Sequence, residues 1–338
     1  MIEKMKVAPN TNRGAENTSK YPLIIDWLTV SGHFITFEEM IEFLGLKNSG
    51  LEFKECPPRW FYKYSVTYDN HITLMLSQKE DYTAGCINLS GQGCRLIESF
   101  SCYSLLDLIK RVAELDGFNV SRIDIAQDVI DDSFSIDTLV KAYRKGNYTC
   151  RSKFSNLMQS QNDGIKGTSL YFGKQNSNCF INIYDKRAER GFQPEDMPNW
   201  MRIEIRLRSV NAQGFANKLT SDEDVGFFYT GVLNNYLRFV VSSKDDNKSR
   251  LATAPYWKKI LSHSEKISVI DSVGVEYNYS KFEKYLFNTC GSSILTYLLT
   301  HSAKELENEL FSRGIKLNQH QQMLVNNYLE DCDFYIIE

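Results

Sequence analysis

Three stretches in the middle of the chain alternate apolar and polar residues, which is the pattern of a β-strand with one buried face. They are residues 121–129 (Ser-Arg-Ile-Asp-Ile-Ala-Gln-Asp-Val), 180–186 (Phe-Ile-Asn-Ile-Tyr-Asp-Lys) and 201–208 (Met-Arg-Ile-Glu-Ile-Arg-Leu-Arg). Each stretch places its isoleucines on one face and charged or hydroxyl side chains on the other. If the three strands share a sheet, its polar face carries three carboxylates, a tyrosine and several cations.

An antiparallel sheet with one solvated face gives the same alternation, so a purely structural interpretation of each strand stays open. Aspartate disfavours strands, however, and two aspartates fall on one face of a single strand. Residues that oppose local propensity are often functional. The pattern therefore favours a functional site. The polar positions are Arg122, Asp124, Asp128, Asn182, Tyr184, Lys186, Arg202, Glu204, Arg206 and Arg208.

The periodicity elsewhere predicts the order strand-helix-strand-strand-strand-helix, twice in succession. We therefore expect an α+β fold: a large, mainly antiparallel sheet made of two β-α-β-β-β-α-like halves, with helices on one face. The Ser-Gly-Gln-Gly segment at 90–93 is predicted to be a turn, and a phosphate-binding nest is the alternative. The expected strands span 24–30, 59–68, 71–77, 82–89, 119–129, 149–158, 168–173, 179–186 and 200–209, and the expected helices begin at Thr36, Ser104 and Ser135 and span 211–219 and 224–240.

Composition along the chain predicts four regions. Residues 1–20 are polar and show no hydrophobic periodicity, which indicates a flexible tail. Residues 21–241 are predicted to form the main domain. Residues 242–250 are charged and lack apolar anchors, which is typical of a linker. Residues 251–338 are predicted to be a small, mainly helical region. The polar stretch 318–322 within it is interpreted as a solvated helix face, with contact to a DNA groove as the alternative.

Hydrophobic residues make up 42% of the 338 positions and charged residues 24%, as in ordinary soluble globular proteins. No apolar run approaches the roughly 20 residues that a membrane span needs, and the first 20 residues contain no signal-like segment. We therefore expect a cytoplasmic protein without a membrane partner. The eight cysteines include no Cys-x-x-Cys pair, which argues against a zinc site and a disulfide framework.

The net charge of −3 argues against a nucleic-acid partner, but its distribution along the chain argues for one. Residues 141–208 contain 13 Lys and Arg against 6 Asp and Glu, a surplus of seven, so the rest of the chain has a net charge of −10. A basic zone around the polar strands is the pattern expected for phosphate contacts, although a solvated basic patch would have the same composition.

Five motifs follow one another along the chain: Ser-Gly-Gln-Gly-Cys-Arg (90–95), Arg-Ile-Asp-Ile-Ala-Gln-Asp (122–128), Leu-Tyr-Phe-Gly-Lys (170–174), Ile-Tyr-Asp-Lys (183–186) and Arg-Ile-Glu-Ile-Arg (202–206). This ordered series resembles the replication initiation factor family. The likeness runs from about Ile25 to residues 257–261. That family comprises rolling-circle initiators of small plasmids and phages and relaxases of integrative elements. The resemblance implies a DNA strand nickase with a tyrosine nucleophile at Tyr184, and makes residues 21–241 its catalytic domain. Tyr171 is the main competing tyrosine.

A tyrosine can cleave DNA by forming a phosphotyrosyl ester, provided that its phenol, with an ordinary pKa of about 10, loses its proton. Lys186 is expected to stabilise the phenolate or the phosphate. Asp124, Asp128 and Glu204 are expected to hold Mg²⁺ or Mn²⁺, since hard cations prefer carboxylates and the sequence contains no His-x-His. Ion pairs between these aspartates and nearby arginines are the alternative. The cations predicted to bind DNA phosphates are Arg122, Lys174, Arg187, Arg202 and Arg206.

The function expected from these observations is a sequence-specific, metal-dependent nickase and religase that initiates rolling-circle replication through a 5′-phosphotyrosyl intermediate. A relaxase of an integrative or conjugative element with the same chemistry is one alternative. A DNA-binding regulator without catalysis is another. The expected partner is a DNA origin, double-stranded or cruciform, with a single-stranded nick site, and the resemblance also implies a host helicase and a possible homodimer.

Overall fold

The computed structural model divides the chain into two compact units, Met1–Ile270 and Asp271–Glu338. The predicted tail at 1–20 and the polar stretch at 318–322 lie outside the described residues. Within the described part of the chain, no helix is long and apolar enough to cross a membrane. The residues that the structure describes are 23–79, 82–132, 135–162, 165–193, 199–219, 225–243, 245, 247–261, 283, 286–314, 317 and 325.

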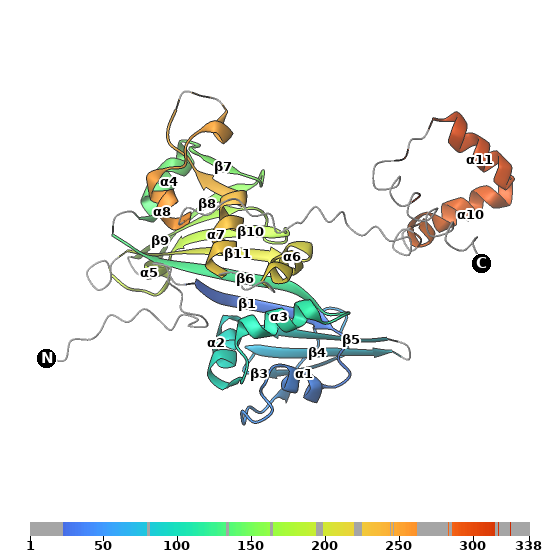
Figure 1. Ribbon diagram of the computed structural model, residues 1–338, viewed down its shortest axis with the longest axis horizontal. Coiled ribbons are helices and arrows are strands. Elements are labelled where there is room, and N and C mark those ends of the chain that lie inside the picture. The colour runs from blue at the N-terminus through green and yellow to red at the C-terminus, as the bar shows by residue number, and fades with distance from the viewer. Residues whose placement is uncertain are drawn as a thin grey trace, which may run out of the picture. The chain divides into compact units, whose positions relative to one another are not determined.

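A ten-stranded sheet forms the frame of the first unit, and each neighbouring pair of its strands is antiparallel (Figure 1). From one edge to the other, the strands are β2 (Lys54–Glu55), β3 (Tyr64–Tyr68), β4 (Ile72–Lys79), β5 (Tyr82–Leu89), β1 (Leu23–Gly32), β6 (Asn119–Ile130), β11 (Trp200–Arg208), β10 (Cys179–Asp185), β9 (Ile165–Phe172) and β8 (Ser155–Asn162).

The sheet consists of two related halves, as predicted, although the second half has an additional helix, Lys186–Glu189, before its last strand. The first strands of the two halves, β1 and β6, pair at the centre, where Ile25 lies opposite Ile125. In each half the chain then passes through a helix and returns by hairpins until its last strand pairs with its first. Thus β5 pairs with β1 and β11 pairs with β6. The α+β prediction is confirmed.

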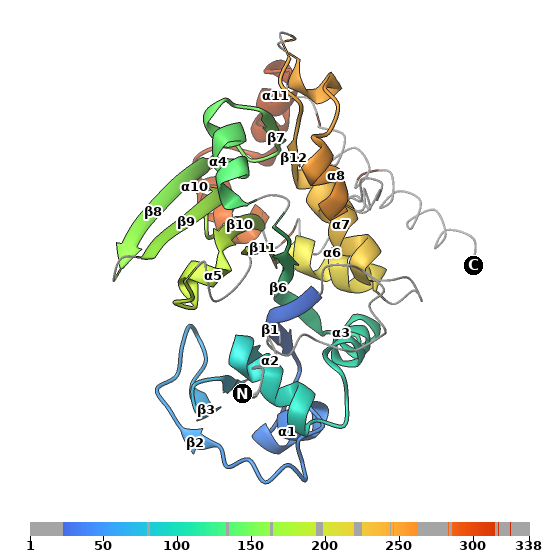
Figure 2. The same cartoon turned by 90° about the vertical axis from the view of Figure 1, so that its left-hand side faces the viewer.

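Helices cover the apolar face of this sheet. One continuous core joins the isoleucines, leucines and valines of the central strands to apolar residues of the helices, including Met40, Phe215 and Trp257. In Figure 2, α3, α6 and α7 lie together on one side of the strands. The helices of the first unit are α1 (Phe37–Phe43), α2 (Gly91–Phe100), α3 (Leu105–Glu114), α4 (Ile136–Arg144), α5 (Lys186–Glu189), α6 (Val210–Lys218), α7 (Val225–Tyr236) and α8 (Pro255–Leu261).

The segment at 90–93, predicted to be a turn, is instead the start of helix α2. The Ser90 hydroxyl accepts a hydrogen bond from the Gly93 N–H at 3.3 Å and caps the helix. Both glycines permit close packing of this helix end. A Cβ on Gly91 would lie 2.7 Å from Oδ1 of Asp26, and one on Gly93 would lie 2.3 Å from the carbonyl oxygen of His71. The glycines therefore bring the N-terminus of α2 against β1 and the β3–β4 hairpin.

The boundary between the units differs from the predicted linker at 242–250. In that segment Arg238 donates to the carbonyl of Ser249 at 2.8 Å, and Val241 N–H donates to Ala252. The following helix α8 packs Trp257 into the main core, 4.9 Å from the ring of Phe239. Residues 242–261 therefore belong to the first unit, because the apolar face of α8 is buried there. The chain divides at Ile270 instead.

Two shorter features complete the described structure. The stretch 224–240, predicted to be one helix, contains α7 and then β12 (Leu237–Phe239), which pairs with β7 (Tyr148–Cys150) in a separate two-stranded sheet. The second unit contains η2 (Leu286–Cys290), α10 (Gly291–Thr300) and α11 (Ala303–Ser312). Ser302 and Glu305 form the predicted capping box of α11. Within its described residues, the second unit is mainly helical.

Candidate active site

The face of the sheet opposite the main core carries the polar side chains predicted from the alternation. Strand register sets which of them meet. Arg202 of β11 lies between Asp128 of β6 and Tyr184 of β10, and Arg206 lies opposite Asp124. The isoleucines of the same strands are buried in the core on the other face. The predicted polar face therefore exists, and it crosses the junction of the two halves.

Tyr184 is the centre of a short hydrogen-bonded cluster. Its hydroxyl donates to Oε1 of Glu204 at 2.7 Å. Nζ of Lys186 donates to the same hydroxyl oxygen at 3.2 Å. The phenol thus has a carboxylate that can take its proton and an ammonium that can stabilise the resulting phenolate. These are two of the requirements for a nucleophilic tyrosine.

Lys186 reaches the hydroxyl in a different way from the one predicted. Strand β10 ends at Asp185, whose carboxylate caps helix α5 by accepting from Ala188 N–H at 3.0 Å. Lys186 is therefore the first residue of α5, not a further strand residue. Its side chain is only 4% exposed and also forms an ion pair with Glu189 of the same helix at 2.5 Å. The turn into α5 folds its ammonium group back over Tyr184.

Burial controls the electrostatics of this cluster. It raises the pKa of the Tyr184 phenol above its usual value, and the negative charge of Glu204 raises that pKa further. Burial also raises the pKa of the Glu204 carboxyl, against the lowering effect of the Tyr184 hydrogen bond, while the charge of Asp26 raises it. Because its pKa is raised, Glu204 is a stronger base than an exposed glutamate. Tyr184 needs such a base, because its own ionisation is disfavoured.

Asp128, predicted to be a metal ligand, is occupied by other groups. Arg202 binds both carboxylate oxygens, with Nε to Oδ1 at 2.7 Å and Nη2 to Oδ2 at 2.8 Å. The indole N–H of Trp200 donates to Oδ1 at 2.9 Å. Asp128 is 1% exposed and Arg202 4% exposed. The pair is a buried, bidentate salt bridge, and it orients Arg202 beside Tyr184.

Asp124 has a similar environment. Arg122 binds it through Nε and Nη2 at 2.8 and 2.6 Å, and Nε of Arg206 donates at 2.9 Å. The guanidinium of Arg122 also stacks on the ring of Trp27, at 4.0 Å from its centroid. The alternative of arginine ion pairs thus holds for both aspartates, although the pairs are buried and not exposed. Among the described residues, no group of three or more His, Cys, Asp or Glu is placed to hold a metal ion.

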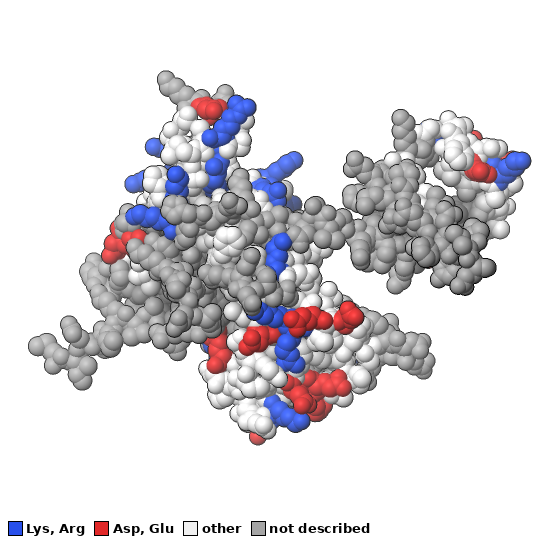
Figure 3. Space-filling model, viewed as in Figure 1, with Lys and Arg blue, Asp and Glu red and all other residues white. Residues whose placement is uncertain are grey.

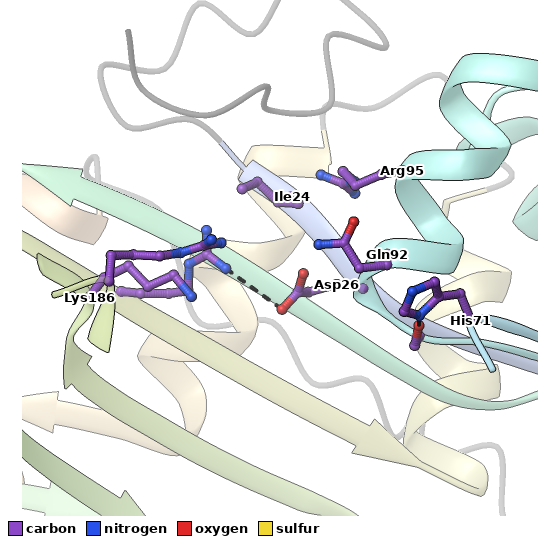
Figure 4. Close-up of a pocket in the computed structure, with 10 residues that line it drawn as sticks. Ile24, Asp26, His71, Gln92, Arg95 and Lys186 are labelled. Carbon is purple, nitrogen blue, oxygen red and sulfur yellow. Dashed lines mark hydrogen bonds and ion pairs between the residues drawn. The ribbon is translucent and has the colours of Figure 1, made fainter. Parts of the chain in front are cut away.

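A cleft of about 620 Å³ opens beside the tyrosine cluster, between the N-terminus of α2 and helix α5. Figure 4 shows Asp26 between Lys186 on one side and Gln92 and Arg95 of α2 on the other. Oδ2 of Asp26 lies 3.6 Å from Nη1 of Arg202, and burial raises the pKa of its carboxyl. The cleft is lined by Ile24, Asp26, His71, Ser90, Gly91, Gln92, Arg95, Lys186, Arg190 and Arg202.

The sequence matches two protein families, one over each half of the sheet. Residues 118–310 match "Replication initiation factor", which is more than half of the chain. The chain belongs to the replication initiation factor family. Residues 22–106 match "Rolling Circle replication initiation protein N-terminal domain". The first match begins just before β6, and the second covers β1 to the start of α3.

Two relatives of this family member resemble it over long segments. The "Putative DNA relaxase NicK" of Bacillus subtilis (strain 168) is 26% identical, and the alignment covers 96% of this chain and 97% of the relative. The solved structure of a rolling circle replication initiator protein from Geobacillus stearothermophilus is also 26% identical. It superimposes with a TM-score of 0.65, covering 74% of this chain and all of that chain.

Sequence analysis of this family member missed the β1 and α2 side of the cleft. Strand β1 has an irregular register between Ile25 and Trp27, so Asp26 and Trp27 both face the polar side. Strict alternation would have put Asp26 on the core face with Leu28. One signal was present: Asp26 is an aspartate in an apolar strand, and the low strand propensity of aspartate was part of the argument for Asp124 and Asp128. Gln92 and Arg95 enter the cleft only because the segment at 90–93 begins a helix.

Of the five predicted phosphate-binding cations, Arg202 lines the cleft and the other four do not. Lys174 is in the turn between β9 and β10, at the opposite end of β10 from Tyr184, with its ammonium 4.0 Å from the centroid of the Phe154 ring. Arg187 of α5 pairs with Asp185 at 3.9 Å. Figure 3 shows the face of the sheet that α3, α6 and α7 cover, and on this face Lys and Arg predominate around the second half of the sheet, above a region of mixed charge.

Proposed function

We propose that this protein is a DNA strand nickase and religase that uses Tyr184 as its nucleophile. The single observation that carries the proposal is that the Tyr184 hydroxyl bridges Glu204 and Lys186, at 2.7 and 3.2 Å. A buried phenol between a base and a cation is arranged for attack, whereas a tyrosine that only fills space needs one partner at most. The similarity to a putative DNA relaxase and to a rolling circle initiator supports DNA as the substrate.

The reaction follows from these contacts. Glu204 takes the phenolic proton as the Tyr184 oxygen attacks a backbone phosphorus atom. The bond from phosphorus to the 3′ oxygen breaks, and that oxygen acquires a proton to become a free 3′-OH. The 5′ phosphate stays attached to Tyr184 as a phosphotyrosyl ester. Religation is the reverse, with the 3′-OH as nucleophile and protonated Glu204 as the acid that returns the proton to the phenol.

Cations at the rim of the cleft suit the phosphates on either side of the nick. Arg95, Arg190 and Arg202 line it together with Lys186. Arg202 is held rigidly by Asp128, so its guanidinium loses little freedom on binding phosphate. Arg202 therefore keeps its predicted role in phosphate binding. Arg122 and Arg206 support the site through Asp124, and an exposed Lys174 would contact DNA farther along the strand.

Metal dependence remains part of the proposal, with a different set of ligands. Asp124 and Asp128 are occupied by arginines, which leaves two candidate ligands: Asp26, which lines the cleft, and Glu204, which is hydrogen-bonded to Tyr184. The charge of Asp26 raises the pKa of the Glu204 carboxyl and so disfavours its ionisation, and a bound cation would oppose that effect. Mg²⁺ and Mn²⁺ suit a site with two protein carboxylates completed by phosphate oxygens and water. When bound, such a cation would neutralise the charge that develops on the phosphate.

The same chemistry serves replication initiation and relaxase activity. We propose nicking of a specific origin, and the match to a putative DNA relaxase over 96% of this chain favours a relaxase as the second candidate role. A DNA-binding regulator without catalysis is disfavoured, since such a protein has no use for the Tyr184 cluster. A host helicase and a second copy of the chain are partners that the family resemblance suggests.

A nicking assay with matched tyrosine variants tests the proposal. Supercoiled plasmid carrying the cognate origin is incubated with purified protein and Mg²⁺ or Mn²⁺. The expected products are open circles with protein linked to the 5′ end. Tyr184→Phe should lose nicking and linkage together while it retains origin binding, and Tyr171→Phe should keep both activities. Normal linkage by Tyr184→Phe would overturn the proposal.

A further inference from the structure

The loop before β3 exposes an unusual group of aromatic and basic side chains. Residues 59–64 read Arg-Trp-Phe-Tyr-Lys-Tyr. Trp60 is 68% exposed, Phe61 73% and Tyr64 56%, and the two cations of the segment are also exposed. Between Cys56 and Tyr64 every charge is positive, whereas the preceding segment contains Glu52 and Glu55. We call residues 59–64 the aromatic loop.

Side-chain packing and hydrogen bonds anchor the aromatic loop to the sheet. Tyr62 is buried at 8% exposure in a small cluster with Met75, Ala84 and Cys86, apart from the main core. The backbone is tied to β4, because Lys63 N–H donates to Leu76 at 3.0 Å and the Ser77 hydroxyl donates to the Phe61 carbonyl at 3.3 Å. The exposed rings are therefore presented by an anchored segment.

Trp60 has a φ of 59°, in the left-handed region that a bulky side chain rarely adopts. Such a conformation persists only where the surroundings impose it, and it often marks a functional position. Here it turns the indole into solvent while its neighbour Tyr62 is buried. Phe61 packs on Tyr62 with ring centroids 4.4 Å apart, which leaves its other surface open.

The aromatic loop lies on the same face of the sheet as Tyr184. In β4, Leu74 and Leu76 point into the main core, so Met75, which supports the loop, points to the opposite face. That face continues through Asn88 and Thr29 to the polar strands, because Thr29 pairs with Asn88 on one side and with Arg122 on the other. In Figure 2, α5 and the segment from β2 to β3 lie on one side of the strands and α3, α6 and α7 on the other.

The position of the aromatic loop relative to the cleft fits a short stretch of nucleic acid. The loop is attached beside Leu76 of β4, and His71, which lines the cleft, directly precedes the same strand. Five residues at about 3.4 Å each put them on the order of 15 Å apart. A strand held in the cleft at one phosphate therefore reaches the loop within a few nucleotides.

We propose that the aromatic loop stacks the unpaired bases of single-stranded DNA that extends from the nick site. Every base has a face on which an exposed ring can stack, and lysine or arginine between the rings neutralises the phosphates. Duplex DNA does not offer those faces. This inference rests on the proposed function, which supplies DNA as the substrate. The rings of Trp60, Phe61 and Tyr64 stack on the bases of the single strand next to the cleft. Arg59 and Lys63 contact its phosphates.

Trp60 also supplies the readout for a test with the full-length protein. All four tryptophans lie in the described part of the chain, and Trp60 is the exposed one, with Trp27 half-buried and Trp200 and Trp257 buried. Oligothymidylate should quench Trp60 emission, and a duplex of equal length should quench it much less. Trp60→Ala and Phe61→Ala should each weaken oligothymidylate binding by about 5- to 150-fold, the range for loss of one stacked base. Duplex affinity should change less than twofold.

Three controls separate stacking from other roles of the aromatic loop. Trp60→Phe should restore most of the affinity, since it retains a ring. Phe100→Ala removes an aromatic side chain that is 49% exposed at the far end of α2 and should have no effect. Replacing both Arg59 and Lys63 by Gln should reduce the slope of log affinity against log salt by about 1.4 for a single strand, at about 0.7 per lost phosphate contact.

The outcomes are distinguishable. If the wild-type protein binds no single strand, the proposed function fails along with the inference. If it binds but Trp60→Ala and Phe61→Ala bind equally well, or an abasic strand binds as tightly as one with bases, only the stacking role is overturned. Unchanged DNA binding by these variants, together with loss of self-association in sedimentation, would assign the rings to a protein interface and would also overturn the inference.

Discussion

Two kinds of carboxylate lie on the polar face of the sheet, and their surroundings differ. Asp124 and Asp128 are each bound by arginine at 2.6–2.9 Å, and Asp128 also accepts from Trp200. Glu204 accepts a hydrogen bond from Tyr184, and Asp26 lies at a cleft, 3.6 Å from Arg202. The first kind is saturated by fixed partners and holds the strands and cations in place. The second kind retains capacity for a proton, a cation or a substrate.

The difference indicates that an acidic residue on this polar face need not take part in the proposed reaction. A buried aspartate with a bidentate arginine has little tendency to bind a metal, because the ion would have to displace the arginine and leave its charge unpaired. A buried glutamate against a phenol is in the opposite situation. Its pKa is raised by burial, so ionisation costs free energy, and taking the proton from Tyr184 relieves part of that cost.

The largest effect should come from the reactive carboxylate. Glu204→Gln keeps the shape and can still accept the Tyr184 hydrogen bond, but the amide cannot take the proton. Single-turnover nicking should fall by about 10²- to 10⁴-fold, the usual contribution of a general base. Origin binding, measured by gel shift, should stay equal or become tighter, since a negative charge near the phosphate is removed. Undiminished nicking would take Glu204 out of the reaction.

A second large effect should come from a saturated carboxylate, on folding instead of chemistry. Asp128→Asn leaves the buried guanidinium of Arg202 without its main counter-charge. The free energy of unfolding, from urea denaturation, should fall by about 3–5 kcal/mol, as when one partner of a buried pair is removed. Asp26→Asn is the matched control at the cleft and should change the free energy of unfolding by no more than about 1 kcal/mol. Equal losses for the two variants would show that the two kinds of carboxylate do not differ.

The sequence was sufficient to predict which side chains of the three central strands share the polar face, but not how the two kinds of carboxylate differ. Alternation placed Tyr184, Glu204 and the aspartates on one face, because side-chain period in a strand is local. Which carboxylate meets an arginine depends on the register between β6 and β11, which alternation along single strands does not encode. Asp26 reaches the polar face only because the register of β1 is irregular between Ile25 and Trp27. Gln92 and Arg95 depend on a helix whose glycines are explained only by the close approach of Asp26 and His71.

A smaller effect sharpens the comparison through pH. The pKa of Glu204 is raised above its ordinary 4.5, so the folded state resists its ionisation. Protonation of Glu204 therefore stabilises the folded state relative to the unfolded state. This contribution is complete below the pKa that Glu204 has in the unfolded state, and it is lost as pH rises through its higher pKa in the folded state. Glu204→Gln does not titrate. Its melting temperature should therefore match the wild type near pH 4 and exceed it at neutral pH. If Glu204→Gln melts at a lower temperature than the wild type at neutral pH, the raised pKa of Glu204 is contradicted.

The most direct test of the central claim is to find the atom that carries the DNA. Wild-type protein is incubated with a single-stranded oligonucleotide that contains the nick site, the adduct is digested with nuclease and protease, and the modified peptide is sequenced by mass spectrometry. The account predicts a nucleotide phosphate on Tyr184, in the peptide that also contains Asn182 and Asp185. A phosphate on Tyr171, or on any residue outside the cluster with Glu204 and Lys186, would contradict it.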